Sequence, residues 1–226
     1  GGKLFLISAD VAQRPLQAFA LFGYRLGRRV ALKLMRREFA ANPKAVKRFF
    51  GEARAVNRIR HEHIVEITDF IEEAGGDNYY IMEMLDGRSL SQLLDKEGFV
   101  DVPRAIDIAL QIADALAVVH AAGIIHRDLK PANVLIDEDG EPQITDFGLA
   151  KILGGDSITA SKLTRSGVAM GTPEYMSPEQ AAGEHWRIDA RSDVYSLGCI
   201  LYEMLSDAPP FSDDNAMAIL SAHVNL

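Results

Sequence analysis

Short apolar runs separated by turn residues fill the first third of the chain and are typical of β-strands. One run spans residues 30–35, and two more, 64–73 and 79–85, lie on either side of a turn-forming Gly-Gly-Asp-Asn sequence. Asn42-Pro43 combines a cap residue with a proline suited to the first position of a helix. Apolar residues then recur at helical spacing: Val46, Phe49, Phe50, Ala53, Val56 and Ile59. The pattern predicts a strand, a helix and two further strands.

Beyond residue 86 the apolar periodicity becomes helical. A long helix ended by Gly123 is indicated by Ile106, Leu110, Ala113, Leu116 and His120. A second, buried helix is indicated by Val194, Leu197, Leu201 and Leu205, and a short final one by residues 215–224. Between the first two, 134–137 and 143–145 predict a small hairpin that turns at Asp139-Gly140. These elements predict an α+β fold with two lobes, 1–86 and 87–226, and a ligand cleft between them.

Composition and charge narrow the class of protein. With 226 residues, 48% of them hydrophobic, the chain can bury a sizeable core. A net charge of −8 offers no basic surface for nucleic acid, and no apolar stretch is long enough to span a bilayer. Residues 4–7 are too few for a signal-peptide core, and Cys199 is expected to be a buried thiol. We expect a cytoplasmic chain, or the cytoplasmic part of a larger, membrane-anchored protein.

Two polar motifs lie in the helical part. Residues 126–133 (HRDLKPAN) bring Asp128, Lys130 and Asn133 together in the sequence, and a DFG sequence begins at Asp146. They supply a carboxylate that can accept a hydroxyl proton, two oxygen ligands suited to Mg²⁺ and an ammonium group. This set suits phosphoryl transfer, in which a protein positions the reactants and neutralises charge. Either motif alone is weak evidence for this chemistry, whereas both motifs in this order are very hard to obtain by chance.

Together these motifs resemble those of eukaryotic-type serine/threonine protein kinases. The lysine two residues after Asp128 resembles the one at this position in the serine/threonine branch of the family. The sequence of residues 171–180 (GTPEYMSPEQ) resembles that of the bacterial members. The resemblance implies a bilobal kinase-like fold that forms one kinase domain. Its N-lobe (1–86) is small and β-rich with one regulatory helix, and its C-lobe (87–226) is larger, mainly helical and without the last helices.

The resemblance implies a role for each polar residue of the two motifs. Asp128 is the expected catalytic base, and Lys130 steadies the transferring phosphoryl group. Asn133 and Asp146 are the expected Mg²⁺ ligands, so ATP and Mg²⁺ are the implied cofactors.

A second group of residues is implied to act with the nucleotide. Lys33 and Ala31 share one face of a strand, and the resemblance makes Lys33 the phosphate-binding lysine and Ala31 a neighbour of adenine. Taken alone, Lys33 reads as an ordinary surface lysine. Glu52 lies on the helix face that packs inward, where a carboxylate needs a partner. The implied partner is Lys33, and the alternative is a solvated pair with Arg54 or Arg48.

The end of the third expected strand, 79–85, is implied to bind adenine through its backbone. Met82 is the expected gatekeeper, Glu83 and Leu85 offer carbonyl and amide groups, and Leu135 lies below the base. The alternative is a strand that simply runs into the turn at Asp86-Gly87.

Further roles are implied around the activation segment. A phosphate there can pair with Arg127, and autophosphorylation is expected at Thr164 and Ser166. Thr172 is expected to orient Asp128 and Lys130, and Asp193 is expected to hold the backbone of the loop at 126–133.

The chain departs from the family at both ends. Residues 4–22 should carry a glycine-rich phosphate loop, yet 9–21 contain no glycine and include Pro15. Without glycine, backbone amides cannot approach phosphates as closely. The family also pairs the glutamate equivalent to Glu179 with an arginine from later helices, which this sequence does not contain, so a weaker lower lobe is expected.

These observations predict an ATP-dependent serine/threonine protein kinase of signal transduction, with protein substrates and reduced activity in this chain. The alternative is a pseudokinase or interaction module that keeps the fold. Small-molecule phosphotransferases are disfavoured by Lys130 and the long activation segment. His61-Glu62-His63 could suggest a metal pair, but its place in a turn favours a structural role.

Overall fold

The computed structural model describes residues 7–8, 16–23, 28–35, 43–72, 78–147 and 172–226. These residues form two compact units. The first contains the described residues up to 60 together with those of 65–86, and the second contains the remainder, 61–64 included. No helix in the described ranges is long and apolar enough to cross a membrane.

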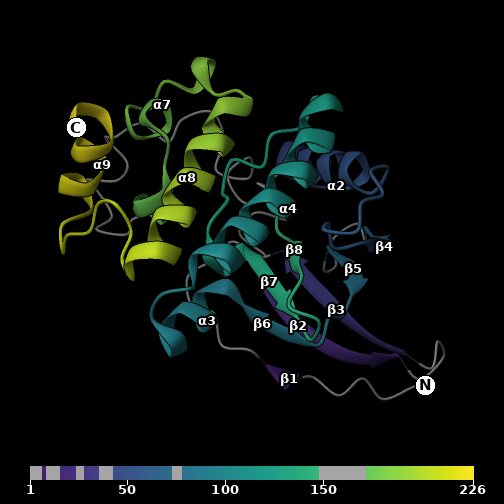
Figure 1. Cartoon of the computed structure of the whole chain (residues 1–226). Coiled ribbons are helices and arrows are strands. Elements are labelled where there is room, and N and C mark those ends of the chain that lie inside the picture. The colour runs from purple at the N-terminus through teal and green to yellow at the C-terminus, as the bar shows by residue number, and fades with distance from the viewer. Residues whose placement is uncertain (1–6, 9–15, 24–27, 36–42, 73–77, 148–171) are drawn as a thin grey trace. The chain divides into compact units, whose positions relative to one another are not determined.

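The first unit is built on an antiparallel five-stranded sheet with the order β1-β2-β3-β5-β4 (Figure 1). Its strands are β1 Ile7–Ser8, β2 Leu16–Gly23, β3 Arg28–Met35, β4 Ile67–Ile71 and β5 Tyr79–Glu83. The three strands expected from the apolar runs are confirmed as β3, β4 and β5. The sequence analysis did not find β2, which pairs with β3 along its whole length.

The helix of the first unit, α2 Pro43–Val56, begins at the expected proline. Its expected apolar stripe is confirmed at Val46, Phe50, Ala53 and Val56, all of them buried. The first three pack with Met35, Ile67 and Tyr80 from the sheet, and the Phe50 and Phe70 rings form a T-shaped pair. The side chain of Phe49 lies outside the described residues. Burial of this stripe holds α2 on the sheet.

The second unit combines a small sheet with helices. The sheet has the order β6 Gly87–Ser89, β7 Val134–Asp137 and β8 Pro142–Ile144. The longer helices are α3 Leu90–Glu97, α4 Val102–Ala121, α8 Ala190–Ser206 and α9 Ala216–Asn225. Short helical turns are η1 Pro131–Asn133, η2 Pro173–Tyr175, α7 Pro178–Ala181 and η3 His185–Arg187. In Figure 1, α4 and α8 lie side by side, and they contact each other.

Local sequence signals set several of these boundaries. The predicted β7–β8 hairpin is confirmed and turns at Gly140, whose φ of 91° favours glycine. Gly123, with φ 75°, follows the end of α4, as expected. Asn215 caps α9 by accepting a hydrogen bond from the amide of Met217.

The two long helices are confirmed, but the faces that the sequence suggested are wrong in part. Ile106, Leu110 and Ala113 of the expected α4 stripe are exposed, and so are Val194 and Leu205 of the expected α8 stripe. The buried positions of α4 are Ala105, Ile108, Ile112, Ala115, Leu116 and Val119. Those of α8 are Ser192, Asp193, Ser196, Cys199, Ile200 and Met204. Apolar residues surround much of both helices, so their spacing does not single out one face.

The difference between the two sides of α4 predicts the effect of one substitution at two positions. Leu116→Ala removes a side chain that is 2% exposed and should lower the free energy of unfolding by about 2–5 kcal/mol, because it leaves a cavity. Leu110→Ala, on the exposed side, should cost about 0.5 kcal/mol or less. Urea denaturation of both variants measures this difference, and equal losses would contradict the observed orientation of α4.

Candidate functional site

The loop of residues 126–133, called here the catalytic loop after the family role expected of it, lies in the second unit. Its first residue, His126, is fully buried and packs against the ring of Phe147 at 4.8 Å between centroids. The His126 Nε2 atom lies 3.0 Å from the carbonyl oxygen of Thr145. The loop is therefore joined to the segment that contains the DFG sequence.

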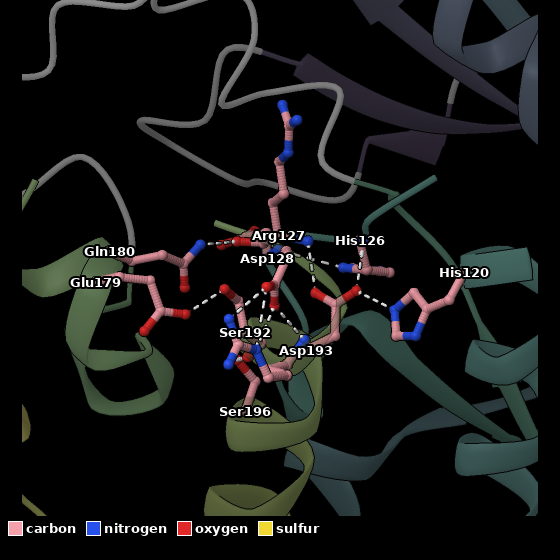
Figure 2. A network of polar contacts seen from close by, with 11 residues as sticks. His120, His126, Arg127, Asp128, Glu179, Gln180, Ser192, Asp193 and Ser196 are labelled. Carbon is pink, nitrogen blue, oxygen red and sulfur yellow. Dashed lines mark hydrogen bonds and ion pairs between the residues drawn. The ribbon is translucent and has the colours of Figure 1, made fainter. Parts of the chain in front are cut away.

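Asp193 holds the start of this loop, as the sequence analysis expected. Its carboxylate accepts hydrogen bonds from the backbone amides of His126 and Arg127, at 2.7 and 2.8 Å. The Nε2 atom of His120 lies 2.8 Å away and donates to the same carboxylate. Figure 2 shows Asp193 between the loop and the His120 ring. Asp193 is 1% exposed, and donors on both oxygens make a buried carboxylate tolerable.

The three polar residues of the loop contact one another. The Lys130 ammonium lies 2.9 Å from Asp128 Oδ2 and donates to the Thr172 hydroxyl at 3.1 Å. Asn133 donates through Nδ2 to the Asp128 carbonyl at 2.7 Å and approaches Asp128 Oδ2 at 3.3 Å. The structure thus brings together Asp128, Lys130 and Asn133, with Thr172 beside the lysine.

Asp146 and Arg127 both have left-handed backbone conformations, each with φ 65°. Such conformations are unfavourable for residues other than glycine and gather at functional sites. Asp146 accepts a hydrogen bond from the Thr145 hydroxyl at 3.2 Å. Burial lowers the pKa of His126, while the nearby carboxylates of Asp193, Asp128 and Asp146 act in the opposite direction. His126 therefore lies within electrostatic reach of all three carboxylates.

The residues expected to contact the nucleotide belong mainly to the first unit. Lys33 lies in β3 between Ala18 and Tyr80 of the neighbouring strands and is 7% exposed. Ala31 lies two residues earlier on the same strand and pairs with Met82.

Glu83 ends β5, its amide donates to the Glu66 carbonyl, and its carboxylate accepts from the Glu66 amide. Leu85 follows this strand and is half-buried, whereas Leu135 lies in β7 of the second unit, opposite Ser89.

Several expected features fall outside the described residues. They are the side chains of Glu52 and Arg48, the phosphorylation positions Thr164 and Ser166, and the stretch 9–15 that links β1 to β2.

The structure also shows contacts that the sequence analysis missed. Gln180 donates through Nε2 to the Arg127 carbonyl at 2.8 Å, and His120 contacts Asp193. Ser192 donates its hydroxyl to the Glu179 carboxylate. A signal for Gln180 was present, because Ser177 and Gln180 have the spacing of a capping box. Its contact with the loop had no signal, since the partner lies 53 residues away.

Glu179, expected to need an arginine, is held by hydroxyl groups instead. Burial alone would raise the pKa of its carboxyl, but hydrogen bonds from Ser192 and Ser177 hold that pKa below its usual value. Neutral donors thus stabilise the ionised carboxylate here.

The remaining candidate groups have structural partners. The His61 ring lies 3.2 Å from Asp114, and the His63 ring contacts the Pro142 carbonyl at 3.0 Å, as the structural reading of this turn expected. Cys199 is buried, as expected, and burial raises the pKa of its thiol to about 11.

Comparisons with known proteins define the class. The family model described as the protein kinase domain matches residues 19–225. Serine/threonine-protein kinase PknA of Mycobacterium tuberculosis is 39% identical over 204 residues, which cover 88% of this chain and 46% of the relative. PknB of Mycolicibacterium smegmatis is 41% identical over 203 residues, covering 88% and 32%. The crystal structure of Rad53 1–466 in complex with AMP-PNP is similar, with a TM-score of 0.75 and 26% identity over 96% of this chain and 52% of that one.

The chain belongs to the protein kinase domain family. Its similarity to serine/threonine kinases of bacteria confirms the family and the kinase-like fold expected from the motifs. The chain spans less than half the length of these curated bacterial relatives.

The lowered pKa of His126 predicts a pH dependence of stability. Its imidazole is neutral in the folded chain, whereas an unfolded imidazole takes up a proton near about pH 6.5. Below that pH the unfolded chain binds more protons, so the free energy of unfolding should fall from about pH 7.5 to about pH 5.5. Urea denaturation across this range measures the slope.

A matched pair of variants isolates the His126 contribution. His126→Phe keeps a ring against Phe147 but cannot titrate, so its slope should be flatter than that of the wild type. His185→Phe makes the same change at an exposed position and should keep the wild-type slope. A His126→Phe slope equal to that of the wild type would show that another group carries the pH dependence.

Proposed function

We propose that this chain is the catalytic domain of a serine/threonine protein kinase that transfers the γ-phosphoryl group of ATP to hydroxyl groups of proteins. The observation that carries the proposal is the contact of Asp128 with Lys130 and Asn133 in a loop held by Asp193. The names of the bacterial relatives support the same activity.

In this proposal Asp128 is the group that receives the proton. As the substrate hydroxyl attacks the γ-phosphorus, the bond from that phosphorus to the β,γ-bridging oxygen breaks and ADP leaves. The hydroxyl proton passes to the Asp128 carboxylate, whose position Lys130 and Asn133 fix. The Lys130 ammonium, between Asp128 and Thr172, offsets negative charge on the transferring phosphoryl group. Catalysis is then mainly positioning and charge neutralisation, as phosphoryl transfer requires.

The donor set fits Mg²⁺, which prefers oxygen ligands and a few protein groups beside phosphates. Asn133 uses its Nδ2 for Asp128, so its Oδ1 is the atom that would bind the ion. Asp146 would contribute a carboxylate oxygen. Bound Mg²⁺ would neutralise phosphate charge, and the protein's part is to fix these two side chains.

Nucleotide binding in this proposal involves both units. Lys33 is buried, and in this proposal its ammonium binds the ATP phosphates and pairs with Glu52. The adenine would lie against Ala31 and Leu135, with hydrogen bonds to the backbone of Glu83 and Leu85. The similar Rad53 structure, determined with AMP-PNP, supports a nucleotide site of this kind.

The proposal extends to partners and regulation. Protein substrates with serine or threonine hydroxyls, autophosphorylation at Thr164 and Ser166, and a cytoplasmic location are consistent with the kinase relatives. Activity lower than that of kinases with a glycine-rich loop is proposed because 9–21 contain no glycine.

Binding of ATP with Mg²⁺ should raise the melting temperature of the chain, because a ligand that binds only the folded state stabilises it. Asp146→Asn removes the proposed charged ligand of Mg²⁺, so the Mg²⁺-dependent part of the shift should shrink. Differential scanning fluorimetry with ATP, with and without Mg²⁺, measures both effects. No shift at millimolar nucleotide would favour an interaction module that does not use ATP.

Substitution of the proposed base should stop catalysis without preventing nucleotide binding. Asp128→Asn should lower kcat by about 10²–10⁴-fold, because the amide cannot accept the hydroxyl proton. Radiolabel transfer to a generic protein substrate measures the rate, and the ATP·Mg²⁺ thermal shift should persist.

Asp139→Asn is the matched control, since Asp139 is exposed in the β7–β8 turn and should leave transfer unchanged. Transfer that survived in Asp128→Asn would reject Asp128 as the base.

A further inference from the structure

Gln180 contacts both α7 and the catalytic loop through one amide group. Its Nε2 donates to the Arg127 carbonyl at 2.8 Å (Figure 2). Its Oε1 accepts from the Ser177 amide at 3.1 Å. A carbonyl can only accept and a backbone amide can only donate, so the two contacts fix which end of the side chain faces which partner. Gln180 therefore joins the start of α7 to the loop that carries Asp128.

The Arg127 carbonyl is one of the groups that determine the local backbone conformation. Arg127 has φ 65°, which is unfavourable for a residue with a Cβ atom and persists only where the surroundings hold it. The peptide before Arg127 is held by Asp193, which accepts from its N–H at 2.8 Å. The peptide after it is held at its carbonyl by Gln180 and at its N–H by His126 Nδ1, at a longer 3.3 Å.

The two peptides determine where Asp128 points. Asp128 follows Arg127 directly, and its carboxylate must stay beside Lys130 and Asn133. A change of ψ at Arg127 or of φ at Asp128 would change the direction in which this carboxylate points. The Gln180 contact, at 2.8 Å, is shorter than the His126 contact with the same peptide, at 3.3 Å, so its loss should loosen the peptide.

We propose that Gln180 is a positioning residue, which directs the Asp128 carboxylate by holding the Arg127 carbonyl. The proposal rests on the kinase function proposed above. It assigns Gln180 a part in catalysis although Gln180 contacts none of the proposed reacting groups, and it links the position of α7 to the catalytic loop.

Gln180→Glu separates this role from helix capping. A glutamate oxygen can still accept from the Ser177 amide, so the capping box of α7 is kept. The other carboxylate oxygen cannot donate to the Arg127 carbonyl and repels it. We expect kcat to fall by about tenfold to a hundredfold, as small misplacements of a catalytic group do, with KM for ATP unchanged.

The chain offers a matched control at α3. Ser89 and Gln92 form the same capping box, and Gln92 is exposed. Gln92→Glu makes the same chemical change at the same helix position and should leave kcat and KM unchanged. If the carboxylate prevents folding, Gln180→Met removes the donor and the capping oxygen together, and Gln92→Met, which loses the same capping oxygen at α3, is its control.

Hydrogen exchange at the amides of residues 126–128 gives a second readout that does not need activity. We expect exchange at least about tenfold faster in Gln180→Glu than in Gln92→Glu, because the loop opens more often. Wild-type kcat and wild-type exchange in the Gln180 variants would overturn the proposal. A wild-type chain that transfers no phosphate would instead overturn the proposed function, and the exchange rates would then decide the role of Gln180.

Discussion

The buried carboxylate of Asp193 is the interaction on which the site depends. Two consecutive backbone amides of the catalytic loop point at it, and a third donor comes from His120. A buried charge is costly unless several hydrogen bonds satisfy it, and buried amides are costly unless they are accepted. The Asp193 carboxylate therefore needs the loop amides, and the amides need the carboxylate. The conformation of the loop is thus set by a residue of α8 rather than by the sequence of the loop. Removal of either side would leave polar groups buried without partners.

This dependence transfers helix packing to the site. Asp193 lies near the start of α8, and His120 lies near the end of α4, so the contact between these helices places Asp193 beside its donor His120. Each of these helices also has fully buried apolar positions, Ile112 in α4 and Ile200 in α8. Positions far from Asp128 in the sequence thus determine how well it is placed.

Local patterns in the sequence predicted the parts of the structure that local chemistry determines. The strand β3, the α2 stripe and the hairpin at Gly140 follow from alternation, helical spacing and turn residues. The grouping of Asp128 with Asn133 follows from a short motif. The buried face of α4 was not predicted, because it depends on which apolar side meets another helix. The hydroxyl partner of Glu179 was not predicted either, because it is a serine distant in the sequence. Gln180 looked like a helix cap, and its second contact is tertiary.

The contacts of His126 also determine its protonation state. The Thr145 carbonyl can only accept, so Nε2 must carry a proton, and the Asp128 amide can only donate, so Nδ1 must be bare. A second proton on Nδ1 would face an N–H group and break that contact. Both residues in the contact between His126 and Thr145 precede a residue with a left-handed backbone. Arg127 follows His126, and Asp146 follows Thr145. The ring therefore contacts the backbone of the proposed base, Asp128, and of the residue before the proposed metal ligand, Asp146.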